Sequence, residues 1–563
     1  MFSPALILLF GGIAMLMLRG LLFHILVVAL PLITLSALIL FSPTVLHLHM
    51  MGVDAYDVMV RPYSTLFACG FTLVAWMAGL MGMRTNKPRE LALGYMYAGA
   101  AVMVVYASDY FFLLIAWELM ALFATLLIWN GGMKDSGGAG MRYAVMHVLG
   151  GVLLLFGVTA KLALGSGGAF TPIEVDIQNF ADSHMLPDIL ITLAVLINVA
   201  APPFSAWVAD SYAEASPSGA VLLSACTTKA SIFVLLTLFT GNHFLLYVGV
   251  FMTLYGFLYA AFAQDVRKLL SYLLVSGLGV MVIGVSIGTP LAQASVVMQA
   301  LSHMLYGAIF FVAAGIAIQS TGTRDIHAMR GFFKQSPLIG VAIVIAVMCA
   351  VAFPLSFSFL TKTLLIKAAI SEGLHAVTLF ISSCVVLGVA HFLFPWSLCF
   401  GSTDKRNAKA ILPEQVAACV LGALMLMVLG LYPTLLLPLL PAKLSFNVYD
   451  VHGVFKQLIL VAVSMVIFYR MLPWFSKVQK PLPDMDIIYR KTLVQLLMKV
   501  ESVWNMLVEM VQIVGKGFML RITAHARVYG SENGLLARTR TISSVVLMMV
   551  LMLLIVIGVY LFR

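Results

Sequence analysis

Long, uninterrupted apolar runs dominate this sequence and limit what it can fold into. About sixteen such runs, most near twenty residues long, follow one another between residues 3 and 562. Lipid offers the backbone no hydrogen-bond partners, so only helices and closed barrels cross a bilayer, and barrels need alternating rather than continuous apolar residues. Charged residues make up 10% of the 563 residues, against roughly 25% in soluble proteins. We therefore expect an all-α polytopic membrane protein with about 14 to 16 transmembrane helices.

The distribution of charge predicts the orientation of the chain in the membrane. Alternate loops hold most of the basic residues, among them Arg84, Lys134 and Arg324, whereas the other loops hold mainly acids such as Asp54 and Glu174. Basic loops remain on the cytoplasmic side, which places the N-terminus outside, in a cell inner (plasma) membrane. The formal net charge of +10 therefore reflects topology, and nucleic acid is not an expected partner.

The sequence gives no sign of a cofactor or a metal site. Its six cysteines are isolated in apolar stretches, and there is no dinucleotide fingerprint, phosphate-binding loop or haem-attachment motif. His47 and His49, with Asp54 and Asp57 nearby, are interpreted as an incidental cluster in a loop. We expect no bound cofactor, no metal and no redox centre, so an enzyme name would apply to the chain only through a complex that contains it.

Two predicted spans contain helix-breaking prolines near their middles. Pro202 and Pro203 interrupt the seventh span, and Pro354 interrupts the twelfth. Such breaks persist in membranes only where they line protein or a wet cavity. The breaks are five spans apart, and an odd spacing reverses helix direction, which predicts two inverted five-helix repeats of the kind that transporters use. Two unrelated proline kinks are the alternative.

The C-terminal region differs from the rest. Polar residues recur at helical spacing from about 486 to 528, which predicts a long amphipathic helix on the cytoplasmic side, followed by a last span. This helix could lie on lipid headgroups or clamp other spans laterally. The predicted segments are N-terminal helices (1–90), a first repeat (91–241), a second repeat (242–400), additional helices (401–476), the amphipathic helix (477–541) and the final span (542–563).

A few ionisable residues fall inside predicted spans. Glu118 and Lys229 lie at the centres of spans five and eight, Lys362 follows the second break, and His303 and His391 lie in spans eleven and thirteen. A lone charge at the bilayer centre costs on the order of 3 kcal/mol, so such residues face protein and often serve an ion path. We interpret Glu118, Lys229, His303 and Lys362 as a proton relay, with a structural salt bridge or a hydrogen-bonded core histidine as alternatives.

Four stretches, in the right order, resemble a known family. They are residues 117–120 (W-E-L-M), 203–219 (P-F-S-A-W-V-A-D-S-Y-A-E-A-S-P-S-G), 265–272 (D-V-R-K-L-L-S-Y) and 353–362 (F-P-L-S-F-S-F-L-T-K). They are similar to motifs of the antiporter-like, proton-translocating subunits shared by Mrp-type Na+/H+ antiporters and respiratory complex I. The form of the second stretch and of the segment around Lys229 resembles the D-type branch of the Mrp subunits.

The resemblance implies roles for individual residues, and departures from the family pattern modify them. Asn198 stands where the family has a lysine in span seven, so the resemblance leaves Lys229 as the expected partner of Glu118. Asn198 would line water, His303 would relay a proton, and Lys362 would gate the second half-channel. Ser205, Gly277 and Gly307 stand where family members carry ionisable residues, which makes this channel poorer in titratable groups.

The predicted function is that of a proton-translocating subunit in a multisubunit Mrp-like cation (Na+)/proton antiporter. Its partners would be other membrane subunits, protons and, as a candidate second ion, sodium. One alternative is the proton-pumping membrane subunit of a redox-driven NADH:quinone oxidoreductase or membrane-bound hydrogenase. A second is a degenerate subunit that only supports such a complex.

Overall fold

A computed structural model describes most of the chain, and it divides the chain into two compact units, residues 1–486 and 487–563. The described residues are 4–40, 47–50, 53–56, 61, 63–84, 88–165, 168–175, 185–329, 336–399, 410–436, 440, 449–475, 484–485, 487, 494–531 and 542–561.

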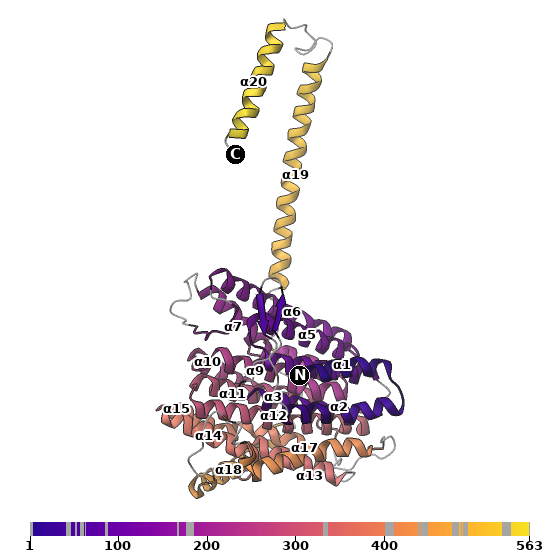
Figure 1. Cartoon of the computed structure of the whole chain (residues 1–563), viewed down its shortest axis with the longest axis vertical. Coiled ribbons are helices and arrows are strands. Elements are labelled where there is room, and N and C mark those ends of the chain that lie inside the picture. Colours follow the sequence, from indigo (N-terminus) through magenta and orange to yellow (C-terminus); the bar gives the residue numbers. More distant parts are fainter. Residues whose placement is uncertain are drawn as a thin grey trace. The chain divides into compact units, whose positions relative to one another are not determined.

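The first unit is a bundle of helices (Figure 1). Its first half contains α1 (Pro4–Met17), α2 (Leu21–Leu40), α3 (Ser64–Gly82), α4 (Pro88–Tyr106), α5 (Tyr110–Trp129), α6 (Ser136–Ala163), α7 (Leu186–Asn198), α8 (Ala206–Glu214) and α9 (Pro217–Leu238). Its second half contains α10 (Phe244–Phe262), α11 (Val266–Ile287), α12 (Pro290–Thr321), α13 (Pro337–Ala350), α14 (Phe357–Ser371), α15 (His375–Leu387), η4 (Gly388–Phe392), α16 (Leu393–Cys399), α17 (Pro413–Leu431), η6 (Pro433–Leu435) and α18 (Val451–Phe475).

The membrane-protein class is confirmed by the helices themselves. Among the described residues, ten helices are long and apolar enough to cross a bilayer, and five shorter helices are also apolar. The sequence did not predict the short antiparallel hairpin of β1 (His47–Met50) and β2 (Val53–Tyr56), which lies between α2 and α3.

Local sequence signals explain where several helices begin and end. The side chains of Asp109, Ser216 and Thr289 accept hydrogen bonds from the first backbone amides of α5, α9 and α12. These short acceptors satisfy amides that have no partner within the helix. Gly288 and Gly322 end α11 and α12 in the left-handed conformation, which glycine adopts without a steric penalty.

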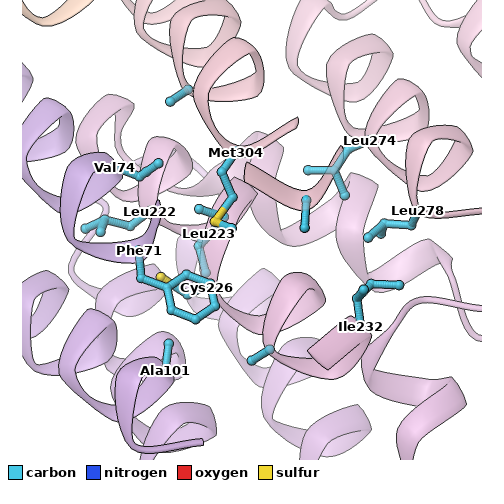
Figure 2. Close-up of a cluster of buried hydrophobic side chains, with 14 of the residues drawn as sticks. Phe71, Val74, Ala101, Leu222, Leu223, Cys226, Ile232, Leu274, Leu278 and Met304 are labelled. Carbon is cyan, nitrogen blue, oxygen red and sulfur yellow. The ribbon is translucent and has the colours of Figure 1, made fainter. Parts of the chain in front are cut away.

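The centre of the first unit is formed by α9 and α12. Buried residues make up 94% of the most apolar window of α9 and 89% of that of α12. Figure 2 shows Leu222 and Cys226 of α9 packed beside Phe71 of α3 and Met304 of α12. A helix that is apolar on all sides is buried on all sides, so a polar residue on α9 or α12 points into protein.

The two predicted helix breaks are present and have the same backbone form. The chain leaves α7 and α13 with Ala200 and Ala352 at φ values of 64° and 51°. After each break the next residue, Ala201 or Phe353, donates its amide to a carbonyl five residues earlier. The helix resumes as α8 and α14. The two breaks therefore match each other as an internal repeat would require. The predicted boundaries of the repeats stay predictions.

The second unit contains α19 (Val494–Gly530) and α20 (Ile542–Leu561). The predicted amphipathic helix over 486–528 corresponds to α19, and its first residues lie outside the described part of the chain. Apolar side chains such as Trp504, Leu507 and Val511 are exposed on α19 within its own unit. Lateral clamping by this helix stays a prediction.

Candidate functional site

Lys229 lies at the centre of the bundle, on α9, where no part of its side chain is exposed. Its ammonium nitrogen donates a hydrogen bond to the backbone oxygen of Ser224 at 2.6 Å. Neighbouring hydroxyls continue the polar region: Thr227 Oγ1 lies 2.6 Å from Tyr97 Oη and 2.8 Å from Tyr143 Oη. An amine buried this deeply needs such partners, because burial without them is costly.

Glu118 does not pair with Lys229, contrary to the expectation from the sequence. No ion pair joins these two residues in the described part of the chain, and Glu118 is exposed on the surface of α5. Its carboxylate lies directly over Gly151 of α6, where an added Cβ atom would collide with it. The physical reason is geometric: α9 is buried, whereas the side of α5 that carries Glu118 faces away from it.

A second polar group occupies the space between α6 and α7. Asn198, fully buried at the last residue of α7, donates to the backbone oxygen of Ala194 at 3.2 Å. Its Nδ2 atom faces Gly150 of α6. His147, one turn earlier on α6, stacks on Tyr143 with ring centroids 3.7 Å apart. The stack connects this group with the hydrogen-bonded hydroxyls of Tyr143 and Thr227.

On the other side of Lys229, His303 of α12 begins a line of polar groups in the second half. His303 interacts electrostatically with both Lys229 and His391. Its imidazole ring occupies space left by Gly277 of α11, where an added Cβ would lie 2.4 Å from Nε2. A cavity of about 20 Å³ is lined by both His303 and His391, which is room for about one water molecule.

A larger cavity extends the line from His391 to Lys362. It has a volume of about 80 Å³, and Gly277, Gln299, Thr361, Lys362 and His391 contribute to its wall. This volume accommodates several water molecules. Lys362 Nζ donates to the backbone oxygen of Ser382 at 3.3 Å and to Gln457 Oε1 at 3.1 Å. His303, His391 and Lys362 therefore follow one another through the second half, and Lys229 of α9 interacts electrostatically with His303 at the start of this series.

Several buried polar atoms of the bundle lack a hydrogen-bond partner among the described residues. They include Asn198 Oδ1, His147 Nε2, Thr228 Oγ1, Ser276 Oγ and His303 Nδ1. Buried polar atoms are nearly always satisfied in native proteins, by protein or by ordered water. Of these residues, Ser276 lines the larger cavity and His303 lines the smaller one.

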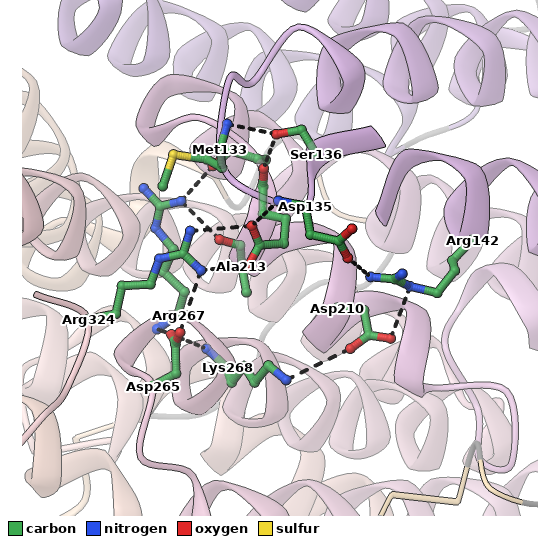
Figure 3. A network of polar contacts seen from close by, with 12 residues as sticks. Met133, Asp135, Ser136, Arg142, Asp210, Ala213, Asp265, Arg267, Lys268 and Arg324 are labelled. Atoms are coloured by element: carbon green, nitrogen blue, oxygen red, sulfur yellow. Dashed lines mark hydrogen bonds and ion pairs between the residues drawn. The ribbon is translucent and has the colours of Figure 1, made fainter. Parts of the chain in front are cut away.

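A network of charged side chains joins the two halves at one end of the bundle (Figure 3). Arg324, after α12, binds Glu214 at the end of α8, with Nη1 and Oε1 2.7 Å apart. Arg267, at the start of α11, donates to the backbone oxygens of Ala213 and Ala215. Burial alone would raise the pKa of Glu214, but the hydrogen bonds and charge of Arg324 outweigh it and lower that pKa below its usual value.

The structure places the predicted residues in two groups. His303 and Lys362 line the cavities of the second half and Lys229 interacts electrostatically with His303, whereas Glu118 and Asn198 lie between α5, α6 and α7. Pro202, Pro203 and Pro354 stand at the breaks and shape the backbone there. The side chains of His47, His49 and Asp57 lie outside the described residues, and the described ones contain no group of three or more His, Cys, Asp or Glu able to hold a metal.

Sequence reasoning missed part of the site. The predicted relay does not include His391, yet this residue lines both cavities. His147 and Gln457 were not singled out. Each interrupts an apolar run with a polar side chain, and that signal could have found them.

Comparisons with known proteins concern the family and the fold of this chain. Over 337 residues the chain is 27% identical to the A/B subunit of a probable K(+)/H(+) antiporter of Rhizobium meliloti; the match covers 55% of this chain and 33% of that relative's length. Its fold matches a chain of an archaeal membrane-bound sulfane sulfur reductase (TM-score 0.70, 20% identity, 99% of both chains). It also matches a chain of the Mrp complex from Dietzia sp. (TM-score 0.72, 21% identity, 100% of this chain and 62% of that one). Residues 107–388, half of the chain, match a family model, and the chain belongs to the transmembrane family described as "NADH:quinone oxidoreductase/Mrp antiporter, TM".

Proposed function

We propose that this chain is a proton-translocating subunit of a multisubunit Mrp-like Na+/proton antiporter in the plasma membrane, with its N-terminus outside. The observation that carries the proposal is the series His303, His391 and Lys362, which two cavities connect inside a membrane bundle, with Lys229 as an electrostatic neighbour of His303. Buried amines and imidazoles at one depth, with room for water between them, can pass protons from one to the next.

Lys229 is the central group of the proposed relay. Proton binding by a buried amine responds strongly to nearby charge and water. Lys229 rests on a backbone oxygen, and His303 is its next ionisable neighbour toward the second half. The predicted repeats, 91–241 and 242–400, would form two half-channels that meet at this point, and Lys362 would open the second one.

Glu118 connects the proposed relay with a neighbouring membrane protein. At mid-membrane, a carboxylate on a lipid-facing surface costs on the order of 3 kcal/mol, and Glu118 is exposed on α5. We infer that another membrane subunit covers this surface and supplies a cation or a hydrogen-bond donor. The presence of this subunit, or protonation of Glu118, would then act on Lys229 indirectly, through the groups between α6 and α7.

The central test replaces Lys229 in the assembled complex. We expect Lys229→Ala to reduce proton flux in proteoliposomes roughly a hundredfold, because the relay loses its middle group. Lys161→Ala is the matched control: Lys161 pairs with Asp188 at 2.6 Å, away from the cavities, and its loss should leave flux unchanged. Wild-type flux in the Lys229→Ala complex would contradict the proposal.

The alternative of a redox-driven pump remains a specific competitor. The archaeal respiratory chain matches this one along 99% of both lengths, and at 20% identity this shared architecture concerns the fold. Purification in mild detergent distinguishes the two. Sodium-dependent proton flux in a complex without flavin or iron–sulfur absorbance supports the antiporter, whereas stoichiometric flavin or iron–sulfur subunits support the pump. A wild-type complex without any proton flux would support a structural subunit.

A further inference from the structure

Gln457 connects a helix outside the predicted repeats with the working groups of the second half. It lies on α18, is 5% exposed, and its side-chain amide reaches two groups at once. Oε1 accepts a hydrogen bond from Lys362 Nζ at 3.1 Å, and Nε2 donates to the backbone oxygen of Val351 at 3.0 Å. Val351 is the first residue after α13, where the helix breaks.

The break creates the need for this contact. In a continuous helix the oxygen of Val351 would accept from the amide four residues later, but here the chain turns at Ala352 and α14 begins only at Phe357. A carbonyl left unpaired inside a membrane costs several kcal/mol. The Gln457 amide supplies the donor that the broken helix lacks.

Chemistry fixes the orientation of the amide. An ammonium group only donates hydrogen bonds and a backbone carbonyl only accepts them, so the oxygen of Gln457 must face Lys362 and the nitrogen must face Val351. If the amide were reversed, its nitrogen would face the Lys362 ammonium, donor against donor, and its oxygen would face the Val351 oxygen, acceptor against acceptor. The break, the amide and the lysine thus form one directed chain of hydrogen bonds.

Packing of α18 holds this amide in place. Gln457, Val461, Ser464 and Phe468 form the buried side of the helix. Ser464 Oγ donates to the backbone oxygen of Val385 on α15 at 3.0 Å, and α15 also provides the Ser382 oxygen that binds Lys362. A shift of α18 against α15 would therefore act on Lys362 directly.

We propose that Gln457 is a positioning residue that holds the Lys362 ammonium at the second helix break, and that the proton leaves Lys362 when this contact opens. The inference rests on the proposed function and extends it by one residue from α18. Among the described residues, Cys384 and Lys456 interact electrostatically with Lys362, and Cys384 and His391 line the same cavity.

The test changes the charge of the amide without changing its shape. Gln457→Glu places a carboxylate beside the ammonium, which holds the proton to higher pH. We expect the pH optimum of proton flux to rise by about one unit, measured per assembled complex in proteoliposomes. Gln457→Leu, which removes both hydrogen bonds, should lower flux roughly tenfold and also alter the pH profile.

Gln415→Leu is the matched control. Gln415 is equally buried, at 3% exposure on α17, and its side chain binds Gln319. Its replacement should leave the pH profile of the assembled complex unchanged. A merely structural Gln457 would change the amount of complex while leaving the pH profile of the remaining complex as in the wild type, and that result would overturn the inference.

Failure of this inference is distinguishable from failure of the proposed function. If Lys362→Ala removes flux while Gln457→Glu and Gln457→Leu keep the wild-type profile, the relay stands and the role of Gln457 falls. If the wild-type complex moves no protons, both fall together.

Discussion

At the residue scale, the position of His303 depends on a side chain that is missing from the facing helix. Gly277 of α11 leaves the space that the imidazole ring occupies, and His303 in turn lies between Lys229 and His391. The absence of a side chain at Gly277 therefore gives the histidine ring its room.

Replacing Gly277 with alanine should therefore reduce transport more than stability. The added Cβ would lie 2.4 Å from His303 Nε2, and the ring can turn away, while alanine is the better helix former by about 1 kcal/mol. We expect normal assembly and a proton flux several-fold lower, measured per complex. Gly284→Ala on the same helix is the control, because its Cβ would meet Val296 Cγ2 at the same 2.4 Å. Equal losses of flux in both variants would show that the added methyl group acts by crowding the helices and not by displacing His303.

At the scale of elements, the two halves are joined by charged contacts at the end where α8 stops and α11 starts. Arg324 binds Glu214, and Arg267 donates to the carbonyls at the end of α8. These contacts hold the second part of the first broken helix against the beginning of a helix in the second half.

The contact between Glu214 and Arg324 should make stability depend on pH. Because the pKa of Glu214 is lowered in the folded protein, its contribution is present at neutral pH and is lost as pH falls through the folded pKa. Glu214→Gln should lower the free energy of unfolding by roughly 1–3 kcal/mol at pH 7, with a smaller difference near pH 4. Thermal unfolding of the solubilised complex at both pH values measures this. Asp135→Asn, whose side chain is 54% exposed, should change stability by less than about 1 kcal/mol, and a larger effect there would contradict the assignment.

At the scale of the whole molecule, the exposed surfaces of the first unit differ in character. The side of α6 beside Glu118 exposes Val148, Val152 and Phe156 around a charged group. The side of α10 exposes Leu254 and Leu258 among uncharged residues. Our proposal assigns the second surface to lipid and the first to a partner subunit.

A bulky substitution on each surface tests this difference. Val152→Trp should prevent neighbouring membrane subunits from co-purifying with the tagged chain, because the surface around Glu118 would no longer fit them. Leu258 faces lipid by our assignment, so the Leu258→Trp protein should co-purify with its partners as the wild type does. Normal assembly of the Val152→Trp protein would show that partners bind elsewhere.

The sequence by itself determined the membrane class, the helical architecture, both broken helices and the family. These properties follow from local patterns: lipid forces continuous apolar runs into helices, and proline in a helix interior removes a backbone hydrogen bond and favours a break. It also named Lys229, His303 and Lys362, because an ionisable residue in an apolar run is conspicuous without any knowledge of its neighbours.

Only the tertiary structure decided which of these residues meet. A linear pattern does not show which side of α5 faces α9, so the predicted pair of Glu118 and Lys229 was wrong, and Glu118 lies over Gly151 instead. The cavities that join His303, His391 and Lys362 arise between helices far apart in sequence, and the contact of Gln457 with the second break links α18 to α13. Contacts across the bundle depend on helix rotation and packing, and these are settled only when all the helices are in place.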